Sequence, residues 1–285
     1  MSQTRIGQLV AAALVSGALI VPALAQPATK LASLEPAKAS TLDLSYRLAF
    51  WGIPFGDTNY DGKFGGDSYA VTSHFKTGGV VSVFWQSEID AMAKGRYDAH
   101  RLEPALYDSL SQRRAQPQAR MKVTFGEGAP VTFADPAFDA TKYPVSDAQK
   151  KEALDPMSAA TLILSGMTAD AANPCGKTAP VFDGRRRYNI EFTYVKDEPV
   201  KFDNGLFNGT AHLCQIHYNQ IAGYKQKIIE EGKKLPPMYG LFADVPSAAA
   251  PSGHYVVAVK LWADTGWGTV SVYLTQLNVS GATKG

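Results

Sequence analysis

The chain has 285 residues, of which 45% are hydrophobic and 11% are aromatic. Its 28 basic and 26 acidic residues leave a formal net charge of +2, so it lacks the strong positive field that drives binding to nucleic acid or to an anionic membrane. The apolar content is ample for a core and no stretch looks like an interdomain linker, so we expect a single β-rich domain over residues 41–280.

Residues 1–25 predict a secretory signal peptide. Arg5 supplies a positive charge, residues 9–21 are apolar, and Ala23-Leu24-Ala25 is a cleavage site of the small-x-small type. The apolar run is too short to span a bilayer and no second run of about 18 residues follows, so no transmembrane anchor is expected. We expect cleavage after Ala25, and a flexible leader rich in Ala, Pro and Lys over residues 26–40.

Alternating apolar and polar side chains predict strands in both halves of the mature chain, because a period of two is typical of half-buried strands. The predicted strands cover residues 42–50, 69–75, 102–107, 120–125, 131–133, 186–194, 206–218, 238–245, 254–262 and 269–279. Residues 80–88 form a short apolar element that fits either a strand or a helix.

The segment from Asp57 to Gly62 begins like an EF-hand calcium loop, with oxygen ligands at alternate positions and Gly at the sixth. Position twelve falls on Ser68, which cannot supply the bidentate carboxylate, and no amphipathic helix flanks the loop. A plain strand and turn is therefore favoured over a metal site.

Helical signals are confined to the middle of the chain. Ser146 followed by Gln149 forms a capping box, and Asp155-Pro156 supplies an N-cap and a proline at the first helical position. The second helix should end near Gly166, and because it is apolar nearly all round we expect it to be buried against the sheet. A short helix is also predicted within residues 224–234, with Glu230 and Lys234 spaced as an i,i+4 pair.

The chain has two cysteines, Cys175 and Cys214. In an oxidising compartment we expect them to form a disulfide. The alternative is a metal site, because His212, Cys214 and His217 have ligand-like spacing. In a strand, however, His212 and Cys214 share one face and His217 points to the other, so we expect neither a metal nor another cofactor.

Arg186 is the candidate binding residue. It follows the Asp183-Gly184 turn and alternates with Tyr188, so on an inward face its guanidinium would enter an apolar environment and need an anion. Two roles remain open. Arg186 either pairs with Asp155 or Asp183 as a structural salt bridge, or it holds the carboxylate or phosphate of a ligand.

A family resemblance rests on Gly-punctuated N-terminal strands and four further pieces of sequence. These are Asp155-Pro156-Met157-Ser158-Ala159, the segment 180–188 (PVFDGRRRY), Cys214, and Ile221-Ala222-Gly223-Tyr224. Over about residues 42–279 the chain resembles the domain-of-unknown-function 3108 family of exported bacterial proteins. The resemblance implies a periplasmic protein of Gram-negative bacteria with a largely antiparallel β-architecture, and it implies no catalytic residues. Residues 224–237 depart from the pattern as an insertion.

These observations predict a mainly β fold: one antiparallel, strongly curved or barrel-like sheet with a buried central helix and one or two short extra helices. Nucleophile-elbow, phosphate-loop and zinc-helix motifs are absent from the sequence, so a non-catalytic role is favoured over an enzyme. The preferred function is an exported periplasmic protein that binds a protein partner or an apolar ligand in cell-envelope maintenance.

Two alternative functions are kept. One is a lipid or lipoprotein carrier of the half-open barrel type, which a large apolar cavity beneath residues 156–166 would indicate. The other is a hydrolase that uses carboxylates such as Asp57 and Asp61, which a polar cleft with close acids of shifted pKa would indicate.

Overall fold

The structure is a computed structural model that describes residues 39–79, 82, 86–98, 101–167, 175–202, 205–232 and 236–281. The predicted signal peptide and nearly all of the predicted leader lie outside these residues. Most of the apolar segment 80–88 lies outside them too.

Within the described residues, the strands form one antiparallel sheet in the order β7-β6-β5-β4-β3-β2-β1-β13-β12-β11-β10-β9-β8. The strands are β1 (Ser40–Phe50), β2 (Ile53–Gly65), β3 (Ser68–Thr77), β4 (Ser87–Tyr97), β5 (Leu102–Arg113), β6 (Ala119–Thr124), β7 (Val131–Asp135), β8 (Thr178–Phe182), β9 (Arg187–Lys201), β10 (Asn208–Ala222), β11 (Met238–Pro246), β12 (His254–Thr265) and β13 (Gly268–Ser280). The chain runs as two meanders, which are joined where β1 pairs with β13. The prediction of a mainly β, antiparallel fold is confirmed.

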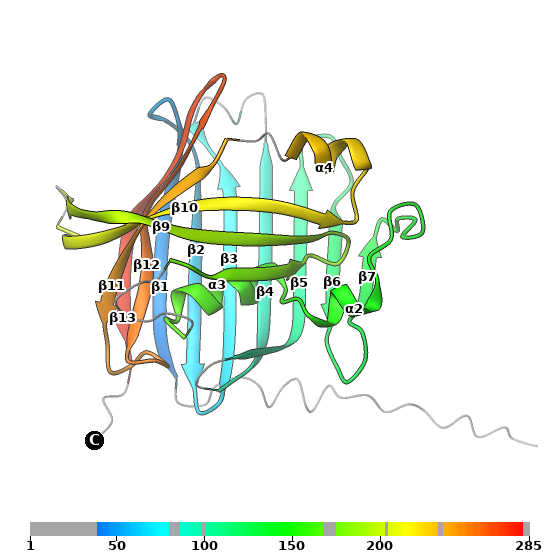
Figure 1. Cartoon of the computed structure of the whole chain (residues 1–285), viewed down its shortest axis with the longest axis horizontal. Helices are drawn as coiled ribbons and strands as arrows, with labels where there is room; N and C mark the ends of the chain where they lie inside the picture. The colour runs from blue at the N-terminus through cyan, green and yellow to red at the C-terminus, as the bar shows by residue number, and fades with distance from the viewer. Residues whose placement is uncertain are drawn as a thin grey trace, which may run out of the picture.

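The sheet is strongly curved but does not close into a barrel. Strands β9 and β10 cross in front of β1 to β5 nearly at right angles (Figure 1). Register shifts between β1 and β13, β4 and β5, β9 and β10, and β11 and β12 contribute to this curvature, because a bulge bends and twists its strand. The two end strands, β7 and β8, do not pair with each other.

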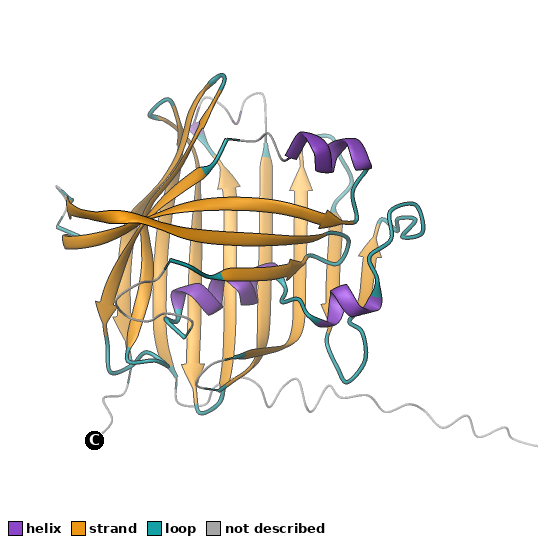
Figure 2. Ribbon diagram, in the orientation of Figure 1, coloured by secondary structure: helices purple, strands orange, loops and turns teal. Residues whose placement is uncertain are grey.

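The helices that the structure describes are short (Figure 2). They are α2 (Asp147–Lys151), α3 (Pro156–Leu164) and α4 (Gln226–Gly232). The capping box of Ser146 and Gln149 and the N-cap of Asp155 are both formed as the sequence predicts. Every helix in this part of the chain is too short or too polar to cross a bilayer.

Helix α3 contacts β3, β4, β5, β8 and β12 between the two crossing parts of the sheet. The core beside it contains fully buried aromatic side chains, among them Phe64, Tyr69 and Tyr255. The hydroxyl groups of two buried tyrosines are satisfied by the helix: Tyr69 Oη lies 2.6 Å from Ser158 Oγ, and Tyr60 Oη lies 3.0 Å from Thr161 Oγ1. These polar contacts fix the helix in one position, because a buried hydroxyl without a partner would be costly.

Strands β4 and β8 are elements that the hydrophobic pattern misses. The inward side chains of β4 include Ala91 and Ala93, followed by Gly95, which give little apolar signal. Gly95 has no room for a side chain, because Tyr69 lies opposite it and a Cβ there would collide with the carbonyl oxygen of Glu103 and approach the Tyr69 hydroxyl.

Candidate functional site

The structure places Arg186 on the surface, so the prediction that its side chain enters the core was wrong. Arg186 belongs to the turn before β9, where Asp183 accepts hydrogen bonds from the backbone N–H groups of Arg185 and Arg186 at 2.9 and 2.6 Å. Residues in a turn do not follow the alternation of the strand, which begins one residue later. The Arg186 guanidinium lies 5.4 Å from the centre of the Tyr224 ring.

Asp183 and Asp155 are therefore not joined as a pair by Arg186. Burial raises the pKa of Asp183, whereas its backbone hydrogen bonds and the nearby charge of Arg186 lower it. Asp155 is 0% exposed. It accepts hydrogen bonds from the backbone N–H of Ser158 at 2.9 Å and from the Ser158 hydroxyl. Burial raises its pKa from 3.8 to about 6.

The buried guanidinium belongs to Arg187, which is 6% exposed. Its Nε donates to the carbonyl oxygen of Gln149 at 3.2 Å, and its Nη1 donates to the Tyr188 carbonyl and to Asn189 Oδ1 at 2.6 and 2.7 Å. Burial lowers the pKa of Arg187 and the charge of Glu152 raises it. Arg187 thus ties the end of α2 to the start of β9, a structural role that the sequence pattern assigned to its neighbour.

Replacing Arg187 with Met should lower the free energy of unfolding by about 2 kcal/mol, because the carbonyl of Gln149 and the Asn189 amide lose a charged donor. The matched change Arg186→Met should alter it by less than about 0.5 kcal/mol, as is usual for surface positions. Urea unfolding of both variants measures the difference. Equal destabilisation by the two variants would contradict the assignment.

Cys175 and Cys214 form a disulfide in the structure, with Cα atoms 5.7 Å apart. Both are buried in a small apolar cluster with Phe192, Ile216 and Phe242. Of the two histidines near Cys214, His212 points its Nδ1 at Asp197 Oδ1, at 2.7 Å. Among the described residues, no group of three or more His, Cys, Asp or Glu side chains is arranged to hold a metal ion.

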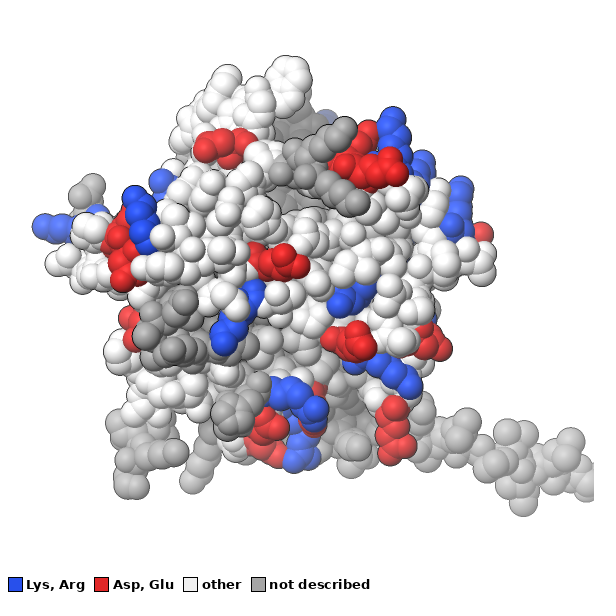
Figure 3. All heavy atoms as spheres, viewed as in Figure 1, with Lys and Arg blue, Asp and Glu red and all other residues white. Residues whose placement is uncertain are grey.

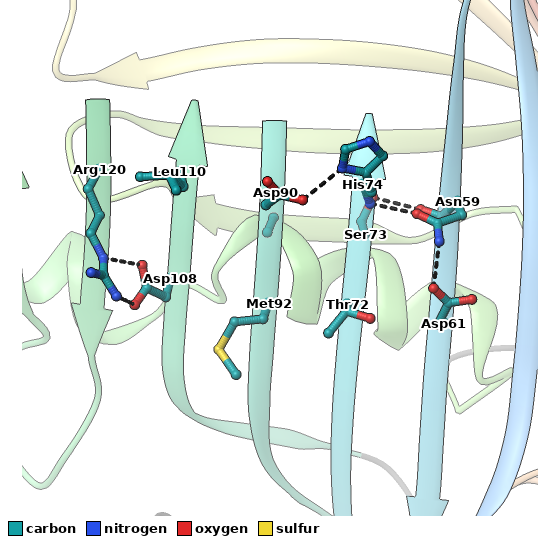
Figure 4. Close-up of a pocket in the computed structure, with 11 residues that line it drawn as sticks. Asn59, Asp61, Thr72, Ser73, His74, Asp90, Met92, Asp108, Leu110 and Arg120 are labelled. Atoms are coloured by element: carbon teal, nitrogen blue, oxygen red, sulfur yellow. Dashed lines mark hydrogen bonds and ion pairs between the residues drawn. The ribbon is translucent and has the colours of Figure 1, made fainter. Parts of the chain in front are cut away.

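The carboxylates considered for a hydrolase lie on the outer face of the sheet. Asp57 pairs with Arg47 at 3.0 Å. Asp61 lines an open polar trough of about 450 Å³ that runs across β2 to β6 (Figure 4). The segment 57–62 lies within β2, as a plain strand rather than a calcium loop.

Each acidic side chain in this trough already has a partner. Asp61 accepts from Asn59 at 2.6 Å, Asp90 lies 2.7 Å from His74 Nδ1, and Asp108 accepts two hydrogen bonds from Arg120. Burial and the charge of Asp43 raise the pKa of Asp61. The trough can offer polar contacts to a ligand, and its charged side chains are already paired with neighbouring side chains.

A second hollow of about 720 Å³ lies beside the end strand β7, and sequence reasoning did not anticipate it. It is lined mainly by apolar and small side chains of β7, of residues 136–145 and of the turn after β8, together with Lys150 and Arg185. The Arg185 guanidinium lies 5.0 Å from the centre of the Phe138 ring. No carboxylate lines this hollow, so its charged groups are both basic. We call it the β7 groove.

The two ends of the sheet differ. The edge of β8 is covered, because Leu154 donates to the carbonyl of Pro180 at 2.9 Å and accepts from the N–H of Phe182 at 2.8 Å. The outer edge of β7 has no backbone hydrogen bond to any described residue. Val131 and Phe133 on this strand are also exposed. An edge strand of this kind is a template for pairing with another extended chain.

On the face that Figure 3 shows, acidic and basic side chains are interspersed among larger uncharged areas rather than gathered into a patch of one sign.

Comparisons with known proteins give a family and a similar solved structure. The family model described as "Protein of unknown function (DUF3108)" matches residues 43–275. No curated protein matches the chain. The chain is similar to the crystal structure of a beta-barrel-like protein of domain of unknown function DUF1849 from Brucella abortus, with 11% sequence identity and a TM-score of 0.49. That match covers 87% of this chain and 100% of the other.

Proposed function

The chain belongs to the DUF3108 family of proteins of unknown function, and from its geometry we propose that it is an exported, non-catalytic periplasmic protein that binds an extended segment of a protein partner in cell-envelope maintenance. The observation that carries the proposal is the β7 groove beside an unpaired strand edge. Main-chain hydrogen bonds to such an edge supply affinity, and an adjacent groove supplies specificity for side chains.

The interior supports a protein partner over an apolar ligand. The carrier alternative needs a large apolar cavity beneath α3. That helix instead buries Met157, Ala159 and Leu164, and its hydroxyl groups bond to Tyr60 and Tyr69 across the interface with the sheet. The β7 groove is within the usual size range of binding sites and opens to solvent beside a strand.

The charge of the β7 groove indicates which kind of partner segment it binds. Lys150 and Arg185 are its charged lining residues, and Lys150 already pairs with Asp147 at 2.9 Å. Arg185 is thus the cation that an acidic side chain or a terminal carboxylate of the bound segment would complement. Such binding should weaken as salt is raised, because exposed charges are screened.

The test begins with a photo-reactive amino acid in place of Ala134, which lines the groove, and a control in place of Thr193, which is exposed on β9. Cross-linking in periplasm followed by mass spectrometry identifies the partner segment that lies in the groove. A synthetic peptide of that segment should bind the purified protein. Cross-links that occur equally from position 193 would contradict the proposal.

Proline substitution then tests edge pairing directly. In an antiparallel pair the N–H groups of adjacent residues point to opposite edges, so only one of Thr132→Pro and Phe133→Pro removes a donor from the β6 ladder. The variant that keeps wild-type stability should weaken peptide binding at least about tenfold, because proline cannot donate at the open edge. Unchanged binding in that variant would refute strand addition at β7.

A further inference from the structure

Two neighbouring hairpin turns form an exposed aromatic tip at one end of the sheet. The β1–β2 turn contains Trp51 and Gly52, and the β12–β13 turn contains Gly266 and Trp267. Trp51 is 70% exposed and Trp267 is 84% exposed, and Ile53 next to the first turn is 55% exposed. Both turns project beyond the rest of the sheet at the upper left of Figure 1.

The two turns are held together rather than independent. The backbone N–H of Trp51 donates to the carbonyl of Thr269 at 2.9 Å. The Trp51 indole lies directly against Gly268, where a Cβ would collide with the ring. Phe50 stacks on Trp51 with ring centroids 5.4 Å apart. Trp51 is therefore fixed in place while most of its surface remains in contact with water.

The backbone at Trp51 conflicts with local preference. Trp51 and Gly52 have φ values of 51° and 78°, the pattern of a type I′ turn, which favours Asn-Gly. A bulky residue with positive φ is strained, and this one gains little burial in return. Conflicts of this kind occur where a side chain is kept for function.

The chemistry of the tip indicates its partner. None of residues 50–54 or 265–269 is ionisable, and the nearest charges on β1 and β2 belong to the ion pair of Arg47 with Asp57. The second turn has one exposed acidic neighbour, Asp264, which accepts a hydrogen bond from the Thr269 hydroxyl at 2.6 Å. Tryptophan is enriched where proteins meet the headgroup region of a bilayer, because its ring is largely apolar and its N–H is polar. A protruding pair of tryptophans with an acidic side chain and no basic one beside them fits a zwitterionic lipid surface better than an anionic one.

We propose that the tip of Trp51, Ile53 and Trp267 inserts into the headgroup region of a phospholipid bilayer and holds the protein reversibly at a membrane surface. This contact is peripheral. It adds a lipid-binding surface to the proposed function and is separate from the β7 groove, since β7 lies six strands from β1 in the sheet. Because Trp51, Ile53 and Trp267 are uncharged and the neighbouring Asp264 is acidic, binding should not require anionic lipid and should depend little on salt.

The test uses flotation of the purified protein with phosphatidylcholine vesicles. Wild-type protein should float with the vesicles, and Trp51→Asn should weaken partitioning about tenfold or more, as expected when one large apolar side chain is withheld from the membrane. Asn is the preferred residue for this turn, so Trp51→Asn should fold with an equal or higher Tm. Weakened binding can then be separated from misfolding.

The matched control is Phe133→Thr, which removes an exposed aromatic side chain from β7 and should leave flotation unchanged. Whichever of Thr132→Pro and Phe133→Pro keeps wild-type stability should also float normally. Lipid binding by the tip and peptide binding at the β7 groove can therefore be refuted independently of each other. Three outcomes would overturn the proposal: no flotation of wild-type protein, equal loss in Phe133→Thr, or flotation only with anionic phosphatidylglycerol at low salt. If the wild-type protein does not float, the tip would instead be assigned to contact with a protein or a sugar.

Discussion

Replacing both Cys175 and Cys214 with alanine should lower the free energy of unfolding by about 4 kcal/mol. The disulfide closes a loop, because the two cysteines are separated by 39 residues in sequence. The cross-link stabilises the fold by lowering the conformational entropy of the unfolded chain. Within the fold the bond joins the segment before β8 to β10, and so braces the part of the sheet that crosses over α3. Urea unfolding of the oxidised wild type and the double variant measures the loss.

A reductant supplies the control for this prediction. Reduced wild-type protein keeps both sulfur atoms in the apolar cluster, so the stability it loses reflects the cross-link, and any extra loss in the double variant reflects packing. The reductant should not affect the double variant. A wild-type protein whose stability is unchanged by complete reduction would show that the disulfide has no stabilising role.

Stability should fall by about 3 kcal/mol in all as pH rises from about 3 to about 7 through Asp155 alone, with about two thirds of the fall between pH 4 and pH 6. Its pKa is 3.8 when unfolded and about 6 when folded, because the carboxyl group is buried. The folded state therefore binds the proton more tightly than the unfolded chain. The stabilisation is fully present below pH 3.8, is lost as pH rises through 6, and does not change further above that.

The variant Asp155→Asn isolates this effect. Asn retains an N-cap acceptor for the Ser158 N–H but does not ionise, so the decline between pH 4 and pH 6 should largely disappear. Asp147→Asn is the control, since Asp147 is an exposed carboxylate at the start of α2 with a pKa lowered by its hydrogen bond and ion pair to Lys150. Urea unfolding at intervals of half a pH unit gives the slopes. Identical slopes for the wild type and Asp155→Asn would refute the assignment.

The elements that sequence reasoning predicted well are those whose signal is local. Strand β1 has Leu42, Leu44 and Tyr46 on one buried face, and α3 begins with Asp155 and Pro156 as its cap requires. Strand β4 was missed because its inward residues are small. That choice makes sense only when Tyr69 on the neighbouring strand is known.

In the candidate site, too, features with a local sequence signal were predictable and features that depend on distant residues were not. The Asp183-Gly184 turn was predictable, but the residue at which β9 begins was not, and one residue decided whether Arg186 or Arg187 is buried. The β7 groove joins β7 to α2 and to the turn after β8, so no single stretch contains its signal. The tip of Trp51, Ile53 and Trp267, unlike the β7 groove, has a local signal. Once a two-residue turn between β1 and β2 is recognised, the sequence shows that Trp51 occupies a turn position that favours Asn.

The pairing of β1 with β13 also sets the order in which the molecule can be completed. Thr41 lies opposite Ser280, and their hydroxyl oxygens are 2.8 Å apart although 239 residues separate them in sequence. During synthesis β1 therefore has no neighbour on one side until the final strand has emerged. Pairing between such distant segments is slow, because a long loop must close before any contact forms. The two halves of the sheet can therefore join along β1 only after β13 has been synthesised.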